Sequence, residues 1–183
     1  MTYYGAKELA DSFRTVRKNT IQVAEDIPED KYGFKAADDM RTVEKLLTHI
    51  AMATRFQYKI HGEEKLTTLE GLDFPALFQG FMAEEAKPRS KKEVIELLRS
   101  NGEIWANFVA ELSDDFLAQT VTMPRGGTPP QRIRFEMILS TKEHEMHHRA
   151  QLMVIERILG IVPHLTRQIQ ERMAQAQQQA SKQ

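Results

Sequence analysis

The sequence predicts an all-α protein built as a four-helix bundle, and three observations support this fold class. Apolar residues recur at steps of three and four over four long segments, which is the period of a helix with one buried face. Polar connections rich in Gly, Pro and Asp separate these segments. No convincing strand pattern lies between them. The 183 residues, of which 41% are hydrophobic, suffice for one domain with a sizeable core.

The first two helices have clear ends. The first is expected to end at Ile27, because Pro28 disfavours helical geometry at the residue before it. The second begins after Thr42, whose hydroxyl can accept a hydrogen bond from the free backbone N–H groups of a first helical turn. It is expected to run to about Ile60 and to stop at Gly62. One face of the first helix carries Leu9, Phe13, Val16, Thr20 and Val23.

A less regular stretch separates the second long helix from the third. Residues 63–90 contain many apolar side chains, and a short helix is expected after Pro75. Ser90 opens the third long helix, because Glu93 three residues later can complete a capping box. The apolar stripe of this helix consists of Val94, Leu97, Leu98, Trp105, Phe108, Val109 and Leu112.

The last long helix follows a connection rich in Gly and Pro at residues 113–130. This fourth helix is expected from about Gln131 to Leu159, and Gly160 closes it. The residues after it are rich in Gln and Ala, which favour helix, but the end of the chain carries no apolar stripe. We therefore divide the chain into a bundle domain at 1–165 and a tail at 166–183 that frays.

Composition and charge exclude several classes of function. The 25 basic residues against 26 acidic ones leave a net charge of -1, without the basic surplus that nucleic-acid binding requires. The chain contains no cysteine, which excludes disulfides, thiolate metal sites and a cysteine nucleophile. No run reaches the roughly 20 apolar residues of a membrane span, and the first residues do not form a signal peptide. We expect a cytoplasmic protein without a nucleic-acid or membrane partner.

Three histidines are expected to face the interior from two different helices. His144 and His148 are one helical turn apart, about 40° around the axis, so their imidazoles can bind the same divalent cation. They share a face with Met137, Gln151 and Ile155. His49 lies on the apolar face of the second helix. Bundles build metal sites from side chains on facing helices, so the pattern predicts a site formed by His49, His144 and His148.

Two other interpretations of these histidines stay open. A single inward histidine is more often a hydrogen-bonded core residue than a ligand. Residues 144–148 also match the H-E-x-x-H helix of zinc metallopeptidases, in which the glutamate, here Glu145, is the general base. The peptidase interpretation is the weaker one, because no strand is predicted to hold a peptide and Val154 stands where one peptidase class has a third histidine. His147 points to another side of the helix and fits the same metal poorly.

These segments resemble the DinB-like superfamily, which includes the YfiT-type thiol transferases and the mycothiol-dependent maleylpyruvate isomerases. Residues 144–151 carry the pattern H-x-x-x-H-R-A-Q, similar to the family's H-x-x-x-H-R-G-Q. Thr42 and Val43, followed by His49, are similar to the family's W-[ST]-V-x-E-x-x-x-H. The family's three metal-binding histidines would fall on His49, His144 and His148, the residues that the helix faces select independently.

The resemblance carries expectations about fold, cofactor and assembly. It implies an up-down-down-up four-helix bundle, a homodimer and a divalent metal ion such as zinc or nickel. Three residues depart from the family's pattern: Arg41 stands in place of tryptophan, Lys45 in place of glutamate and Ala150 in place of glycine. None of these departures removes a ligand.

A site of three imidazoles leaves coordination positions open for water or substrate, as catalytic sites do. We therefore expect a metal-dependent enzyme that acts on a small molecule, either a transferase of low-molecular-weight thiols, as the resemblance implies, or a hydrolase. Any thiol must come from a cosubstrate, because the chain has no cysteine. The alternative from another class is a non-catalytic, stress-related or ligand-binding module, in which the three histidines hold a metal structurally or hold none.

Residues around the ligands are harder to predict. Gln151 shares the face of the histidine pair and is expected to hydrogen-bond a ligand. Glu145 is a second candidate for such a supporting role, although it lies about 100° around the helix from His144. His61 and His164 lie near helix ends and are expected to face solvent. No catalytic residue is assigned besides the candidate ligands.

Overall fold

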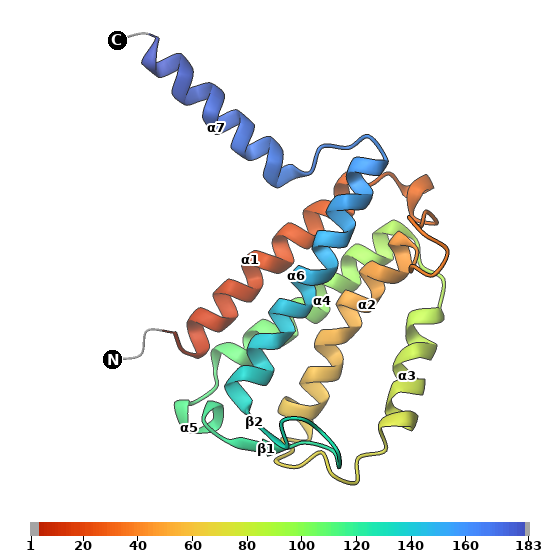
Figure 1. Cartoon of the computed structure of the whole chain (residues 1–183), viewed down its shortest axis with the longest axis vertical. Coiled ribbons are helices and arrows are strands. Elements are labelled where there is room, and N and C mark those ends of the chain that lie inside the picture. The colour runs from red at the N-terminus through yellow and green to blue at the C-terminus, as the bar shows by residue number, and fades with distance from the viewer. Residues whose placement is uncertain (1–3, 182–183) are drawn as a thin grey trace.

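Four long helices form the core of the structure, a computed structural model that describes residues 4–181 (Figure 1). In Figure 1, α1 and α6 run upward and α2 and α4 run downward, while α3 returns the chain from the end of α2 to the start of α4. This is the predicted up-down-down-up order. α1 and α2 each pack against both α4 and α6. The bounds of these helices are α1 Ala6–Asp26, α2 Val43–Tyr58, α3 Phe74–Ala86, α4 Lys91–Ala110 and α6 Arg134–Ile158.

The helices begin where their capping residues predict. The Thr42 hydroxyl accepts a hydrogen bond from the backbone N–H of Lys45 at the start of α2. Ser90 and Glu93 form the predicted capping box at the start of α4. Asp73 caps α3, which has Pro75 in its first turn.

Two short features differ from the helix-only prediction. α2 continues into a π-helical turn at Lys59–Glu63. The fourth helix begins three residues later than expected, because Gln131–Ile133 forms a strand, β2, that pairs antiparallel with β1, Thr120–Thr122. The two prolines before β2 cannot lie in the interior of a helix. The β-branched residues of β1 favour a strand, and this strand pairs with residues 131–133. A one-turn helix, α5 (Asp114–Leu117), precedes this ribbon.

The bundle core contains an ion pair between α1 and α6. Arg17 Nε and Nη2 each donate to the Glu145 carboxylate at 2.9 Å, and the two side chains are almost fully buried. Apolar clusters lie toward either end of the bundle, one around Leu47 and Leu98 and the other around Trp105. α4 passes close to the arginine at Gly102, where an added Cβ would lie 2.8 Å from Arg17 Nη1.

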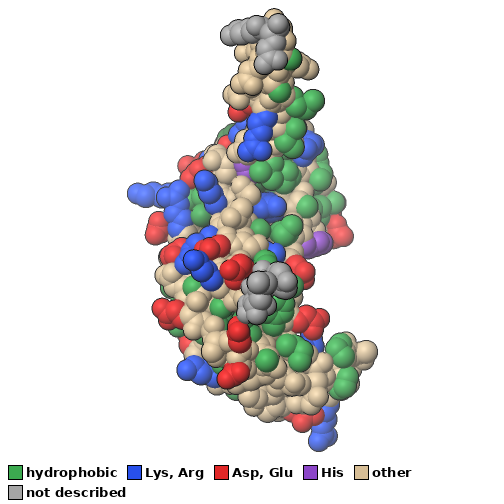
Figure 2. Space-filling view, turned by 90° about the vertical axis from the view of Figure 1, so that its left-hand side faces the viewer, with side chains coloured by type: hydrophobic (Ala, Val, Ile, Leu, Met, Phe, Trp, Pro, Cys, Tyr) green, Lys and Arg blue, Asp and Glu red, His purple; other side chains and the backbone are tan. Residues whose placement is uncertain are grey.

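The chain after α6 forms a further helix, α7 (His164–Ala180), which projects away from the bundle (Figure 1). Arg167 at its start pairs with Asp26 at 2.6 Å. Apolar side chains run along one edge of the projecting helix (Figure 2), and Ile169 and Met173 are among those exposed. The tail is thus helical through most of its length, while the domain boundary at 165/166 stays a prediction.

Within residues 4–181, no helix is long and apolar enough to cross a membrane.

Candidate metal centre

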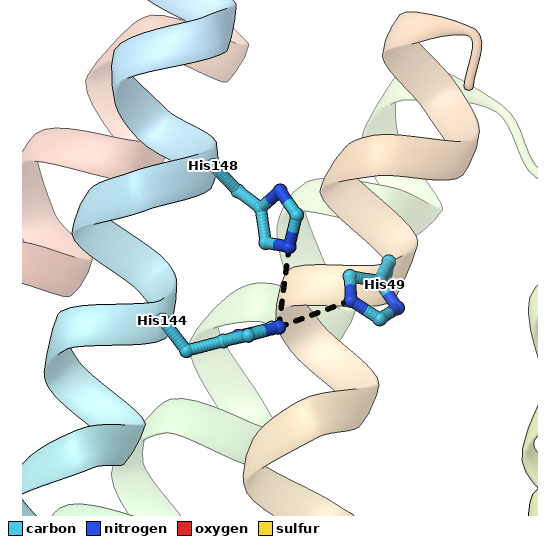
Figure 3. Close-up of side chains that lie close together, drawn as sticks. All are labelled: His49, His144 and His148. Atoms are coloured by element: carbon cyan, nitrogen blue, oxygen red, sulfur yellow. Dashed lines mark hydrogen bonds between the residues drawn. The ribbon is translucent and has the colours of Figure 1, made fainter. Parts of the chain in front are cut away.

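Three histidines from two helices converge at one point between α2 and α6 (Figure 3). His144 Nε2 lies 3.1 Å from His49 Nε2 and 3.2 Å from His148 Nε2. The candidate ligand atoms all lie within 4.8 Å of one another. We call these three residues the histidine triad. The structure therefore brings together the three histidines that the sequence selects.

The local sequence explains how each helix presents its imidazole. His49 lies on the side of α2 that faces α6, in a segment where Leu46, Leu47 and Ile50 are buried in the bundle core. His144 and His148 are separated by one turn of α6, so both rings leave the same side of the helix. His49 and His144 are only partly buried.

The outer nitrogens of two of the rings have hydrogen-bond partners. His49 Nδ1 lies 2.6 Å from Glu85 Oε1 of α3, and His148 Nδ1 lies 2.8 Å from Gln151 Oε1. A carboxylate oxygen and an amide oxygen only accept, so the proton of each neutral ring sits on Nδ1. The Nε2 atoms of His49 and His148 therefore carry lone pairs that point toward His144.

This arrangement fits a divalent cation better than it fits a hydrogen-bonded histidine cluster. His144 Nε2 can donate at most one proton, so it cannot satisfy two facing lone pairs fully. A metal ion accepts all three lone pairs, and imidazole nitrogens are suitable ligands for zinc and nickel. The Nδ1 partners of His49 and His148 also follow the usual pattern of metal sites, in which a carboxylate or carbonyl oxygen orients a ligating ring, while His144 Nδ1 has no such partner among the described residues. The donor set and its surroundings thus fit the predicted ion.

The electrostatic environment favours the neutral, metal-binding form of His144 and His148. Burial lowers the pKa of His144 to about 4, and the neighbouring His148 and His49 add to this shift. Burial also lowers the pKa of His148, against the hydrogen bond to Gln151, which raises it. Burial is the largest influence on the pKa of Glu85 and raises it, but the hydrogen bond from His49 and the charges of His49, Arg41 and His144 together outweigh burial, so the net shift is downward. The site therefore combines the neutral imidazoles of His144 and His148 with an ionised carboxylate at Glu85.

A pocket of about 380 Å³ opens beside the triad, between α2, α3 and α6. His49, His144 and Glu85 are among its lining residues. Most of its other walls are apolar, and the Phe-rich helix α3 forms one side. The pocket is lined by Arg41, His49, Met52, Ala53, Phe56, Gln57, Phe78, Phe81, Met82, Glu85, Ser140, Thr141 and His144. Two residues of the triad, His49 and His144, thus line a space large enough for a small molecule.

Comparison with known proteins identifies the family. The sequence profile of the DinB superfamily matches residues 12–152 of this chain. The chain belongs to the DinB superfamily. The match spans the four long helices from α1 to α6 and includes all three histidines of the triad.

Two solved structures from Bacillus subtilis have a similar fold. The DinB-like protein YjoA of Bacillus subtilis is 20% identical, with a TM-score of 0.62 over 84% of this chain and 92% of its own. YfiT of Bacillus subtilis, described as a probable metal-dependent hydrolase with an unusual four-helix bundle topology, is 14% identical. Its TM-score is 0.64 over 88% of this chain and 91% of its own. A search of curated proteins finds no match. These likenesses show that the DinB-like chain has the expected bundle fold.

The structure separates the two candidate supporting residues of this DinB protein. Gln151 lies next to the triad through its hydrogen bond to His148. Glu145 points instead toward α1, where Arg17 binds its carboxylate, because it lies about 100° around α6 from His144. We therefore assign Glu145 no place at the triad. Its buried ion pair also deprives the peptidase interpretation of a free general base.

Two other expectations about histidines are wrong. His61 is fully buried, and its Nδ1 lies 2.8 Å from Arg134 Nη1. Burial, assisted by the charge of Arg134, lowers the pKa of His61 to about 3. His164 is also buried, with its Nε2 3.3 Å from Asn19 Oδ1. Both lie near helix ends, as predicted, but other segments of the chain fold over those ends.

Glu85 is a residue of the site that the sequence does not predict, because it lies 36 residues from its partner His49. No local spacing links the two, because α3 reaches the triad only through the tertiary fold. One departure from the family pattern, Lys45, gives a partial indication of where Glu85 lies. Lys45 Nζ donates to the carbonyl oxygens of Glu85, Ala86 and Lys87 at 3.0, 2.9 and 3.1 Å. The residue that departs from the family's glutamate thus holds the end of α3 that carries Glu85.

Proposed function

We propose that this DinB-superfamily protein is a metal-dependent enzyme that acts on a small electrophilic molecule, by hydrolysis or by transfer of a low-molecular-weight thiol. One observation carries the proposal: three imidazole nitrogens converge beside a pocket, and hydrogen bonds at Nδ1 orient two of the three rings. The fold shared with YfiT, a probable metal-dependent hydrolase, supports it. Zinc and nickel are the ions that we propose for the site.

In this proposal, separate groups of residues bind the metal ion, orient its ligands and bind the substrate. His49, His144 and His148 hold the ion, while Glu85 and Gln151 keep the rings of His49 and His148 in the right orientation and tautomer. A bound divalent cation supplies a Lewis acid that lowers the pKa of a coordinated water or thiol. The apolar walls of the pocket bind the electrophile and exclude bulk water around it.

Titration of the metal-free protein with zinc and with nickel tests the site. Each of the three single replacements by Ala, at His49, His144 or His148, should weaken metal binding by at least about tenfold, because each removes a ligand. His147→Ala is the matched control, since its ring lies outside the triad but on the same segment of α6. Equal loss of affinity in the control, or none in the three triad variants, would contradict the proposed site.

Turnover assays separate the proposed reactions. The zinc- or nickel-loaded protein is offered aryl esters and aryl halides, each with and without bacillithiol, mycothiol or glutathione. Turnover without thiol supports a hydrolase, and turnover that requires thiol supports a transferase. Both activities should vanish on metal removal and return when metal is added back. A loaded protein that turns over none of these combinations would favour the non-catalytic binding module instead.

A further inference from the structure

We propose that the pocket beside the triad binds an aromatic ring of the substrate and thereby places the group attached to that ring at the three histidines. This inference rests on the proposed function and specifies the substrate class. Three phenylalanines, Phe56 of α2 with Phe78 and Phe81 of α3, carry it, because their side chains form an aromatic wall.

The geometry of the wall suits another ring. The centroids of Phe56 and Phe78 are 5.5 Å apart with an interplanar angle of 30°, which is a stacked pair. Phe56 and Phe81 meet edge to face, with centroids 5.3 Å apart and an angle of 70°. These are the distances and orientations that aromatic side chains prefer, so a ligand ring can extend the same packing.

Part of the pocket wall is exposed to solvent and would be covered by such a ligand. Phe78 and Met82 are 52% and 56% exposed, although both lie on the pocket. An apolar ring placed against them would remove apolar surface from water on both sides of the contact. The polarizable sulfur of Met82 also packs well against an aromatic face or edge.

Charge at the pocket favours a neutral ring over an ionised one. Arg41 and Glu85 are the two charged residues of the lining. Arg41 Nε lies 3.8 Å from Glu85 Oε2, so their opposite charges offset each other. Two polar atoms, Gln57 Oε1 and Thr141 Oγ1, are buried and have no hydrogen-bond partner in the part of the chain that is described. A buried polar atom without a partner costs free energy, which a polar substituent on the ring would recover.

There is room beyond the ring. A second cavity of about 330 Å³ shares four lining residues with the first and lies against β2 and the loop before α3. The shared residues are Phe56, Gln57, Phe78 and Ser140. A substituent on the side of the ring away from the triad can extend into this space, so the pocket does not limit the ligand to a single ring.

Hydroxamates of different size test the inference on the zinc-loaded protein. Acetohydroxamate and benzohydroxamate share the metal-binding group, so the ratio of their dissociation constants measures what the ring contributes. We expect benzohydroxamate to bind at least about tenfold more tightly. Phe78→Ala should reduce this ratio severalfold, whereas Ile104→Ala, which removes a comparably exposed apolar side chain from α4, should leave it unchanged. A ratio near one, or a ratio equal in both variants and the wild type, would overturn the inference.

A second measurement does not depend on metal. The metal-free protein is labelled at the methionine methyl groups and titrated with benzamide, which carries the ring without a hydroxamate. The methyl signals of Met52 and Met82, both in the pocket lining, should shift, while the signal of Met146, exposed on α6, should not. Absence of these shifts overturns the aromatic pocket. Failure of the protein to bind zinc or nickel instead overturns the proposed function, so the two failures are distinguishable.

Discussion

Glu85 contributes to the triad through one short hydrogen bond to His49 Nδ1. Replacing it by Ala should lower zinc affinity by about 10- to 100-fold, because the His49 ring then loses the group that fixes its tautomer and orientation. Glu85→Gln should cost less, since an amide oxygen can still accept from Nδ1. Competition with a chelator measures both, and Glu84→Ala is the control because Glu84 pairs with Lys87 and Arg89 instead. Wild-type affinity in Glu85→Ala would show that the hydrogen bond is dispensable.

Glu156 is a buried carboxyl whose two oxygens have no hydrogen-bond partner among residues 4–181. Burial raises its pKa to about 7 from the usual 4.5, and the nearby Asp26 adds to the shift. A raised pKa means that the folded protein is favoured while the carboxyl is protonated. This contribution is complete below about pH 4.5 and is lost as the pH rises through 7.

Glu156→Gln should therefore raise the free energy of unfolding more at pH 8 than at pH 5. The expected difference between the two pH values is about 1–3 kcal/mol, because the amide keeps the shape of the protonated carboxyl and cannot ionise. Urea unfolding at both pH values measures it, with the exposed Glu143→Gln on the same helix as a control. The same gain at pH 5 and pH 8 would exclude ionisation as the cause.

At the scale of elements, the contact between α1 and α6 includes the buried ion pair of Arg17 and Glu145. Arg17→Met should lower the free energy of unfolding by about 3–5 kcal/mol, because it leaves a buried carboxylate unpaired. The double variant with Glu145→Met should be less destabilised than this single variant, since no charge then remains in the interior. Denaturant unfolding of Arg17→Met, Glu145→Met and the double variant measures the difference. A double variant as unstable as the sum of the two single ones would mean that the pair contributes through packing alone.

α3 is attached to the bundle differently from the long helices. None of its described residues is fully buried. It is held by the aromatic wall of the pocket, by the hydrogen bond from His49 to Glu85, and by Lys45, which binds its last carbonyl groups. The helix that completes the proposed substrate pocket therefore also supplies a supporting residue of the triad, so pocket and triad share one structural element.

At the scale of the whole molecule, large apolar side chains remain exposed on α6 and α7, including Val154, Ile158, Ile169 and Met173. Surfaces of this kind often mark protein–protein contacts. We expect the full chain to form a homodimer, which light scattering at micromolar concentration would report as twice the chain mass of 21.1 kDa. A mass of one chain across that concentration range would contradict the expectation.

The sequence by itself determined the long helices and the three histidines of the triad. Both depend on relations between residues close along the chain. The apolar period fixes which face of a helix is buried, Thr42 and Ser90 mark where two helices start, and one helical turn places His144 and His148 side by side. His49 needed one further assumption, namely that two apolar faces carrying imidazoles would meet in the bundle core.

Only the tertiary structure decided which distant groups meet. Glu85 contacts His49, 36 residues away, and Arg134 contacts His61, 73 residues away. Neither contact can be predicted from the spacing of neighbouring residues in the sequence. Residues 131–133 form a strand because β1 lies beside them, although their own sequence pattern predicts the first turn of the following helix. The physical reason is that helix periodicity acts over a few residues, whereas burial, pairing and pKa depend on which elements pack together in space.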